Sequence, residues 1–376
     1  MVHIRYIDNS NDFEFCRYAS ACRHRKEFQM QFGHFDDQQR EYVITDPRTP
    51  LPWINYLGSE DFFTLLSNTA GGYCFYRDAR LRRLTRYRYN NCPVDQEGFH
   101  IYIKDGKTVW NPGWQPTKTE LDRYTCRHGL GYSVIEGQKN GVSAAQTLLV
   151  PQGENCLLIR LCLKNETDIK KTLDVFPYVE FCLWDAMDDS SNFQRNFSIG
   201  EVELEPEAIY HKSEYRERRN HYAVLWANRP YDGFDTARDA FIGPYGSPAL
   251  PEAVAAGCCT GSIAHGWAPV GAMQFHLELC PGESQELFFG LGYVENPEGE
   301  KFSAPGVINK TRAHTMIETY RTAAQFDAAA DALRGYWDTL LSNYHAETGD
   351  EKVDRMVNIW NQYQCMVTFN MSRSAS

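Results

Sequence analysis

Residues 52–91 decide the fold, and they read PWINYLGSEDFFTLLSNTAGGYCFYRDARLRRLTRYRYNN. Threonine, tyrosine and phenylalanine are frequent in this stretch, and such side chains suit a pleated, half-buried strand. Gly71 and Gly72 interrupt the apolar run, so we expect a hairpin or a bulge at that point. The stretch therefore predicts strands rather than a loop.

Arginines alternate with aromatic rings in the second half of this stretch. One face of the expected strand carries Arg82, Leu84, Arg86 and Arg88, and the other carries Arg83, Thr85, Tyr87 and Tyr89. At least one face is therefore not ordinary apolar core, because buried arginine must pair with carboxylates, stack on rings or meet a polar ligand. Pairing with Asp or Glu in an interface between domains or subunits is the favoured interpretation, and direct anion binding is the alternative.

The composition indicates a folded, β-rich protein. A chain of 376 residues is too long for one ordinary core, so two domains are expected. The aromatic share of 14% favours strands and sugar contacts through ring faces. The net charge of −11 opposes nonspecific nucleic-acid binding, which relies on Lys and Arg at phosphates. We expect no nucleic-acid partner.

The twelve cysteines do not predict disulfides, because most of them lie in apolar, strand-like runs. Free buried thiols in a reducing cytoplasm fit this placement better. No apolar run approaches the ~20 residues that a membrane-spanning helix needs. The sequence contains no His-Glu-x-x-His and no Cys-x-x-Cys pattern, so a metal site is not expected. We predict a cytoplasmic protein with no membrane segment.

Between Met30 and about residue 292, short apolar runs separated by turn residues predict a large antiparallel β-sandwich. Consecutive antiparallel strands are expected at 143–150, 157–163 and 172–183, with residues 165–171 as the hairpin between the last two. Further strands are expected at 201–204, 222–227, 274–279 and 286–293. A tight turn at 281–284 should join the final pair.

Near Val307 the apolar period changes to three and four residues, which predicts helices at 308–324, 326–344 and 350–371. Thr348 and Glu351 have the spacing of a capping box that opens the last helix. These helices cannot bury both of their faces alone, so the end of the chain is expected to be the start of a larger helical domain. At the other end, residues 1–29 are polar and aperiodic, and we interpret Met30 as the natural start and 1–29 as an upstream extension.

Seven short runs make the chain resemble the cellobiose phosphorylases of glycoside hydrolase family 94. They are FGHFDD (32–37), REYVIT (40–45), WINYLG (53–58), RLRRLTRYRYN (80–90), NFQRN (192–196), YRERR (215–219) and WNQYQCMVTFNMSRS (360–374). The resemblance implies an N-terminal β-supersandwich of galactose-mutarotase-like type, a helical linker, an (α/α)₆ catalytic barrel and a small C-terminal sheet domain. In this chain we expect the extension at 1–29, the supersandwich at 30–300, the linker at 301–347 and the start of an incomplete barrel at 348–376.

The resemblance also implies a reaction, the inverting phosphorolysis of cellobiose to α-glucose 1-phosphate and glucose. Inorganic phosphate is a co-substrate there, and no cofactor is needed. Cleavage requires a carboxylic acid at the leaving oxygen and cationic donors around the phosphate. By resemblance the acid lies past residue 376, so no catalytic residue is assigned. Asp185, Asp188 and Asp189 are interpreted as a polar loop.

Two arginines are the candidate binding residues. Arg373 matches the family's arginine at the phosphate pocket, where a guanidinium fork suits a dianion; a solvated chain-terminal arginine is the alternative. Arg195 matches a sandwich loop that reaches the acceptor-glucose subsite, where Phe193 would stack on the sugar; an ordinary surface arginine is an equal alternative.

We therefore expect the N-terminal part of a cellobiose phosphorylase, inactive alone and homodimeric as the family implies. The alternative is a carbohydrate-binding or assembly module that complements a separately encoded barrel. A nonfunctional fragment of a broken gene is a third possibility.

Overall fold

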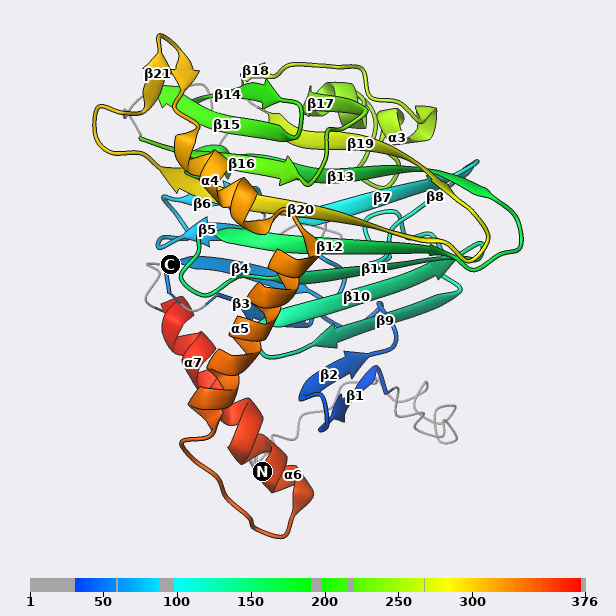
Figure 1. The fold of residues 1–376 in the computed structure, drawn as a ribbon, viewed down its shortest axis with the longest axis vertical. Helices are drawn as coiled ribbons and strands as arrows, with labels where there is room; N and C mark the ends of the chain where they lie inside the picture. Colours follow the sequence, from blue (N-terminus) through cyan, green and yellow to red (C-terminus); the bar gives the residue numbers. More distant parts are fainter. Residues whose placement is uncertain are drawn as a thin grey trace, which may run out of the picture. The chain divides into compact units, whose positions relative to one another are not determined.

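Two antiparallel sheets hold most of the strands in the computed structural model, which describes residues 31–58, 60–87, 98–190, 198–215, 220–266 and 268–372 (Figure 1). The chain divides into two units, Met1–Phe32 and Gly33–Ser376, and everything below concerns the second. The expected extension at 1–29 lies outside the described residues.

The first sheet has eleven strands within the described residues. Its order is β1 (Gly33–Asp36), β2 (Glu41–Ile44), β9 (Arg123–His128), β10 (Tyr132–Lys139), β11 (Val142–Leu149), β12 (Cys156–Asn165), β20 (Ser284–Glu295), β16 (His221–Ala227), β15 (Ala208–Tyr215), β14 (Ser198–Glu205) and β18 (His265–Gly266). Buried and half-exposed residues alternate along β10 and β11, as expected for strands with one face on a core.

The second sheet has nine strands in the same described ranges. Its main path is β17 (Gly233–Ala237), β19 (Pro269–Leu279), β13 (Lys171–Trp184), β6 (Arg83–Thr85), β5 (Gly72–Tyr76), β4 (Phe62–Ser67) and β3 (Ile54–Leu57), and β7 (Phe99–Asp105) pairs with β13 and with β8 (Thr108–Trp110). A separate two-stranded ribbon joins β21 (Phe302–Ala304) to β22 (Val307–Ile308). The two large sheets bury one shared apolar core, so the expected mainly β, antiparallel sandwich is confirmed.

The glycine pair in the deciding stretch lies at the β4–β5 hairpin, as expected. Gly72 has a φ of 131°, and a Cβ at this position would lie 2.0 Å from the carbonyl oxygen of Leu65 on the paired strand. Only glycine permits this close approach of two backbones. The hairpin therefore depends on the residue that marked it in the sequence.

One expected hairpin, at residues 165–171, is wrong in its pairing, whereas the expected turn at 281–284 is confirmed. Residues 165–171 join β12 to β13, and residues 281–284 form the expected turn between β19 and β20, but both connections pass from one sheet to the other. β12 pairs instead with β20, with Cys156 opposite Gly292, and β13 pairs with β19. Both faces of β12 and β13 are apolar, so their patterns do not show which sheet each strand joins.

Asn165 ties the two crossings together. Its side-chain amide donates to the carbonyl oxygens of Ile169 at 2.7 Å, Leu279 at 3.0 Å and Cys280 at 3.2 Å. Its backbone N–H donates to Glu283 O at 3.0 Å, and its own carbonyl accepts from Gly282 N at 2.9 Å. The Asn165 side chain is fully buried. Its hydrogen bonds therefore satisfy backbone groups at the two crossings in place of water.

Helices cover the outer faces of the sandwich. α4 (Thr311–Tyr320) and α5 (Ala323–Leu341) cross the outer face of the eleven-stranded sheet (Figure 1). α2 (Arg238–Ile242) and α3 (Glu252–Ala256) pack on β7, β13 and β19 of the second sheet. α1 (Ala186–Ser190) follows β13 directly.

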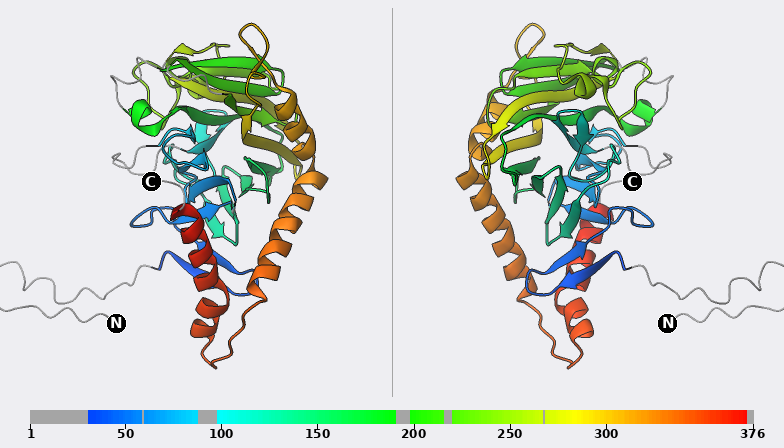
Figure 2. Two further views of the ribbon diagram at one scale, coloured as in Figure 1. Left: turned by 90° about the vertical axis from the view of Figure 1, so that its left-hand side faces the viewer. Right: turned by 90° about the vertical axis from the view of Figure 1, so that its right-hand side faces the viewer.

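The last helical segment turns back from α5 and runs up toward the sandwich (Figure 2). It consists of α6 (Glu351–Arg355), a π-helical turn η2 (Met356–Trp360) and α7 (Asn361–Ser372). The expected Thr348 capping box is wrong, because Thr348 donates to Asp354 and Asp350 caps α6 by accepting from the N–H groups of Lys352 and Val353. The reciprocal box lies instead at Thr322 and Gln325, where α5 begins.

The described cysteines are free thiols, and Cys74, Cys126, Cys156 and Cys182 are buried. Burial raises the pKa of the Cys74 thiol to about 12, although Thr64 and Thr85 bond to it. In the described ranges no helix is long and apolar enough to cross a membrane, and no group of His, Cys, Asp and Glu has the arrangement of a metal site.

Asn165→Ala should lower the free energy of unfolding by about 2–3 kcal/mol, because buried backbone carbonyls at both crossings lose their donor. Ile169→Ala is the matched control, since that side chain is 60% exposed and only its backbone oxygen takes part. Urea denaturation measures both variants. Equal stability of the two would show that the amide does not hold the crossings.

Candidate functional site

The sequence-predicted binding residues lie outside the described residues. Phe193 and Arg195 belong to 191–197 and Arg373 to 373–376. Their roles stay predictions. The structure does describe the residues that lead into each segment, α1 before 191 and α7 before 373, and these define two sites.

The first site is a buried ion cluster around Arg86. Its Nε donates to Asp189 Oδ2 at 2.7 Å and its Nη2 to Asp189 Oδ1 at 2.9 Å, which is a bidentate pair. Nη1 lies 3.3 Å from Glu180 Oε2, and Glu180 Oε1 accepts from Arg238 Nε at 2.8 Å and from the Tyr178 hydroxyl at 2.8 Å. Arg86 and Asp189 are 5% and 3% exposed, so water does not share these contacts.

This cluster confirms the carboxylate pairing of the favoured interpretation for Arg86, whose partners lie on α1 and β13 of the sandwich; a place in an interface between domains or subunits stays a prediction. Arg83 instead stacks on an aromatic ring, with its guanidinium 4.3 Å from the centre of the Tyr73 ring. The polar-loop interpretation of the three aspartates is wrong for Asp189, which lies buried in α1, whereas Asp185 accepts from the N–H groups of Met187 and Asp188 at the start of that helix.

Glu180 cannot serve as a proton donor at neutral pH. Burial raises its pKa, but Arg86 and Arg238 outweigh that effect and the net pKa is lowered. The carboxylate therefore stays ionised. The cluster anchors α1 and β13 rather than performing acid catalysis.

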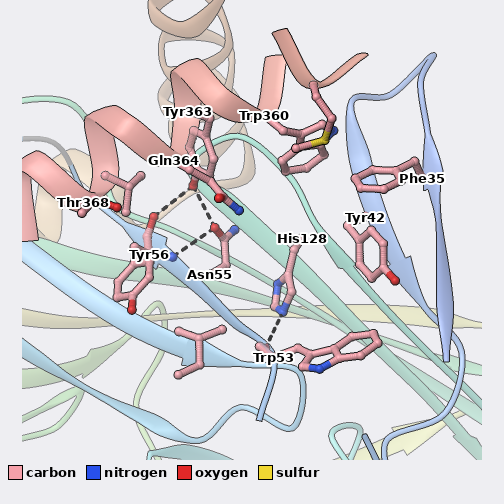
Figure 3. Close-up of a pocket in the computed structure, with 13 residues that line it drawn as sticks. Phe35, Tyr42, Trp53, Asn55, Tyr56, His128, Trp360, Tyr363, Gln364 and Thr368 are labelled. Atoms are coloured by element: carbon pink, nitrogen blue, oxygen red, sulfur yellow. Dashed lines mark hydrogen bonds between the residues drawn. The ribbon is translucent and has the colours of Figure 1, made fainter. Parts of the chain in front are cut away.

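The second site is the seam between α7 and the sandwich (Figure 3). The Tyr363 hydroxyl lies 2.8 Å from Asn55 Oδ1 and 3.0 Å from the Tyr56 carbonyl oxygen, and it accepts from the Gly131 N–H at 3.0 Å. Asn55 Nδ2 donates to the carbonyl oxygens of Gly129 at 2.9 Å and Tyr132 at 2.8 Å. Both side chains are buried, so α7 is held to β3 and the β9–β10 turn by a network without water contact.

His128 extends this network along the floor of the seam. Asn55 Nδ2 lies 3.2 Å from Ser133 Oγ, Ser133 Oγ lies 2.8 Å from His128 Nδ1, and His128 Nε2 lies 3.0 Å from the Trp53 carbonyl oxygen. Burial lowers the pKa of His128 to about 4, so the ring is neutral at pH 7. Nε2 must then carry the proton that the carbonyl accepts, and Nδ1 accepts from the serine.

Beside this network lies a groove of about 420 Å³, called the seam groove here. Four rings form its aromatic wall: Phe35 lies 4.8 Å from Tyr42 and 5.6 Å from Trp360, and Tyr42 lies 5.6 Å from Trp53, centre to centre. Among the described residues, the groove is lined by Phe35, Tyr42, Trp53, Ile54, Asn55, Tyr56, His128, Met356, Trp360, Tyr363, Gln364, Val367 and Thr368 (Figure 3). The volume is within the range of ligand sites.

Two ion pairs close the far end of the seam. Arg355 pairs with Asp37, and Arg40 pairs with Asp338. Arg355 also places its guanidinium 4.9 Å from the centre of the Phe35 ring. The first two strands are therefore joined to α5 and α6 through side chains.

The seam groove is not built for glycosidic cleavage by itself. The described residues of its lining include no carboxylate and no cationic side chain, so they offer neither a general acid nor a cradle for phosphate. Its buried polar groups, at Asn55, His128 and Tyr363, already bond to one another and to the backbone.

Comparison with known proteins assigns the chain to a family. The family model described as "Glycosyl hydrolase 94, supersandwich domain" matches residues 40–323. The chain belongs to glycosyl hydrolase family 94. A second model, "Glycosyl hydrolase 94 superfamily, catalytic domain", matches residues 336–376.

Several relatives of this family 94 chain are named as phosphorylases of disaccharides. It is 35% identical to the N,N′-diacetylchitobiose phosphorylase of Vibrio furnissii and 33% identical to that of Vibrio proteolyticus. It is 28% identical to the 3-O-β-D-glucopyranosyl-β-D-glucuronide phosphorylase of Paenibacillus borealis. Each match covers 92% of this chain and 42% of the relative, so the chain spans about two fifths of the length of these relatives.

The two family models together match all the described lining residues of the seam groove except Phe35. Tyr42, Trp53 and Ile54 belong to the region matched by the supersandwich model, and Met356 and Thr368 to that matched by the catalytic model. Sequence reasoning missed this groove, although the WINYLG and WNQYQC runs that carried the resemblance contain seven of its residues. The presence of lining residues in both runs was the sequence signal that could have predicted the groove.

Arg86→Met should lower the free energy of unfolding by about 3–5 kcal/mol, because Asp189 would stay buried without its counter-charge. Arg77→Met is the control, since the Arg77–Asp61 pair at 2.6 Å is largely exposed and is expected to contribute less than about 1 kcal/mol. Urea denaturation at pH 7 compares them. A loss in Arg86→Met no larger than that in Arg77→Met would contradict the structural role.

Tyr363→Phe should lower the free energy of unfolding by about 1–3 kcal/mol, because Asn55 and Gly131 lose a buried partner. Hydrogen exchange should speed up in α7 before the sandwich strands. Tyr344→Phe is the control, since that side chain is 56% exposed. Unchanged exchange in α7 would show that the hydroxyl does not hold the helix.

Proposed function

We propose that this chain is the N-terminal portion of a disaccharide phosphorylase, comprising the supersandwich, a linker and the start of the catalytic domain. The match of the supersandwich model to residues 40–323, followed by a catalytic-domain match that begins at 336, carries the proposal. We retain 30–300, 301–347 and 348–376 as its proposed parts, with 348–376 beginning an (α/α)₆ barrel. The named phosphorylases support the reaction class.

The reaction would transfer a glycosyl group from a β-linked disaccharide to phosphate with inversion. It needs an acid at the leaving oxygen and positive or polar donors at phosphate, but no carboxylate base, because phosphate is the nucleophile. Neither described site supplies that acid: Glu180 stays ionised, and the seam groove has no carboxylate in its lining. We therefore propose that the acid comes from residues beyond these 376.

For binding, we propose that Arg373 meets phosphate and that Phe193 and Arg195 meet the acceptor sugar. The ion cluster of Arg86 and Asp189 lies directly before 191–197, so it would hold the base of that segment. A cytoplasmic homodimer is the proposed working state.

Cellobiose is the proposed disaccharide, and N,N′-diacetylchitobiose is the second candidate. The second is favoured by the two Vibrio relatives, which share 35% and 33% identity with this chain. The alternative function belongs to another class. In it, the chain is a carbohydrate-binding or assembly module for a separate catalytic polypeptide, and it catalyses no reaction itself.

Purified chain, incubated with phosphate and either disaccharide, should release no sugar 1-phosphate, whereas the Vibrio furnissii relative assayed alongside should do so from N,N′-diacetylchitobiose. Joining residues 30–376 to the part of that relative that follows the matched region should restore phosphate-dependent cleavage. Cleavage by the chain alone would overturn the assignment of the acid. A folded but inactive chimera would overturn the proposed function.

A further inference from the structure

We propose that the seam groove is the docking site for an apolar segment of the catalytic domain that follows α7 in the relatives. This inference rests on the proposed function and names the partner that the groove receives. The occupant is a stretch of large aliphatic or aromatic side chains, supplied by the continuing polypeptide or by a separate one.

The first argument is continuity with an interface that already exists. One wall of the groove is supersandwich and the other is catalytic domain, and the Tyr363–Asn55 bond joins the two walls at its edge. Catalytic-domain polypeptide therefore already contacts β3 here. A further segment of the same domain would extend that contact along the groove.

The second argument is the chemistry of the lining. The buried polar groups of the groove are engaged by Asn55–Tyr363 and by the Ser133–His128–Trp53 chain, so an apolar insert would break no hydrogen bond. The aromatic wall and Ile54, which is 42% exposed, offer apolar surface to it. A sugar would instead require free donors and acceptors around its hydroxyls.

The third argument is the length of the relatives. Each spans the matched region with only 42% of its chain, so more than half of each relative lies outside the matched region and can supply a segment that packs on the groove. α7 presents Gln364 and Thr368 to the groove from its exposed side. The π-helical turn before it places Met356 and Trp360 in the same groove, so the helical segment after which the relatives continue lines this cavity.

The test adds a separate polypeptide, the part of the Vibrio furnissii relative that follows the matched region, to the full 376-residue chain. Binding is measured by titration calorimetry. Ile54→Asp places a charge in the groove, and Ile169→Asp makes the same change at an exposed isoleucine in the 165–171 connection. We expect wild-type chain and Ile169→Asp to bind equally and Ile54→Asp to bind at least about tenfold more weakly.

A second pair of variants tests the opposite wall in case Ile54→Asp does not fold. Gln364→Arg blocks the groove from α7, and Asn361→Arg adds the same side chain to an exposed position of α7 that does not line it. The first should weaken binding and the second should not. Thermal unfolding checks that each variant is folded.

Several outcomes overturn the proposal. One is that the added polypeptide binds groove and control variants equally, or binds none of the chains. Another is that the chain alone forms dimers that Ile54→Asp disperses. A third is that the chain binds cellobiose or N,N′-diacetylchitobiose in a way that Ile54→Asp abolishes. Activity of the mixture is scored separately. A groove-dependent complex without phosphorolysis overturns the proposed function alone, and phosphorolysis unaffected by groove variants overturns the docking site alone.

Discussion

A buried amide, that of Asn55, is the contact on which the junction of the two family domains depends. A hydroxyl from α7 and two carbonyl groups from the β9–β10 turn converge on it at distances of 2.8–2.9 Å. Because these groups are buried, breaking any of these hydrogen bonds costs the free energy of leaving a polar group without a partner. The amide therefore holds α7 in place against the sandwich.

The sequence predicted the strands, the glycine hairpin and the helical end, because period and turn chemistry are local properties. It failed where a choice depends on distant residues. Leu161 and Val175 are both fully buried, yet one belongs to β12 in the first sheet and the other to β13 in the second. The sequence of a strand that is apolar on both faces does not indicate which strand it pairs with. The short connection at 165–171 has the length of a hairpin loop, although it joins strands of different sheets.

The functional sites show the same limit. Arginine beside aromatic rings correctly indicated carboxylate pairing and ring stacking, but nothing near Arg86 in the sequence shows that its partner is Asp189, 103 residues later. The aspartate was assigned to a loop because Asp and Ser are common in turns, and its burial in α1 came only from tertiary contacts. Family resemblance predicted Phe193, Arg195 and Arg373 as binding residues, which lie outside the described residues, whereas the geometry of the described residues revealed the seam groove.

The sheet crossings also have a consequence for the order of assembly. β12 lies between β11 and β20, and Cys156 finds its partner Gly292 more than a hundred residues later. While the ribosome is still making the intervening chain, that edge of the first sheet has open N–H and C=O groups. Non-local pairing of this kind closes slowly. During translation the β12 edge of the first sheet therefore stays unpaired until β20 has been synthesised. Chaperones would matter most in this interval.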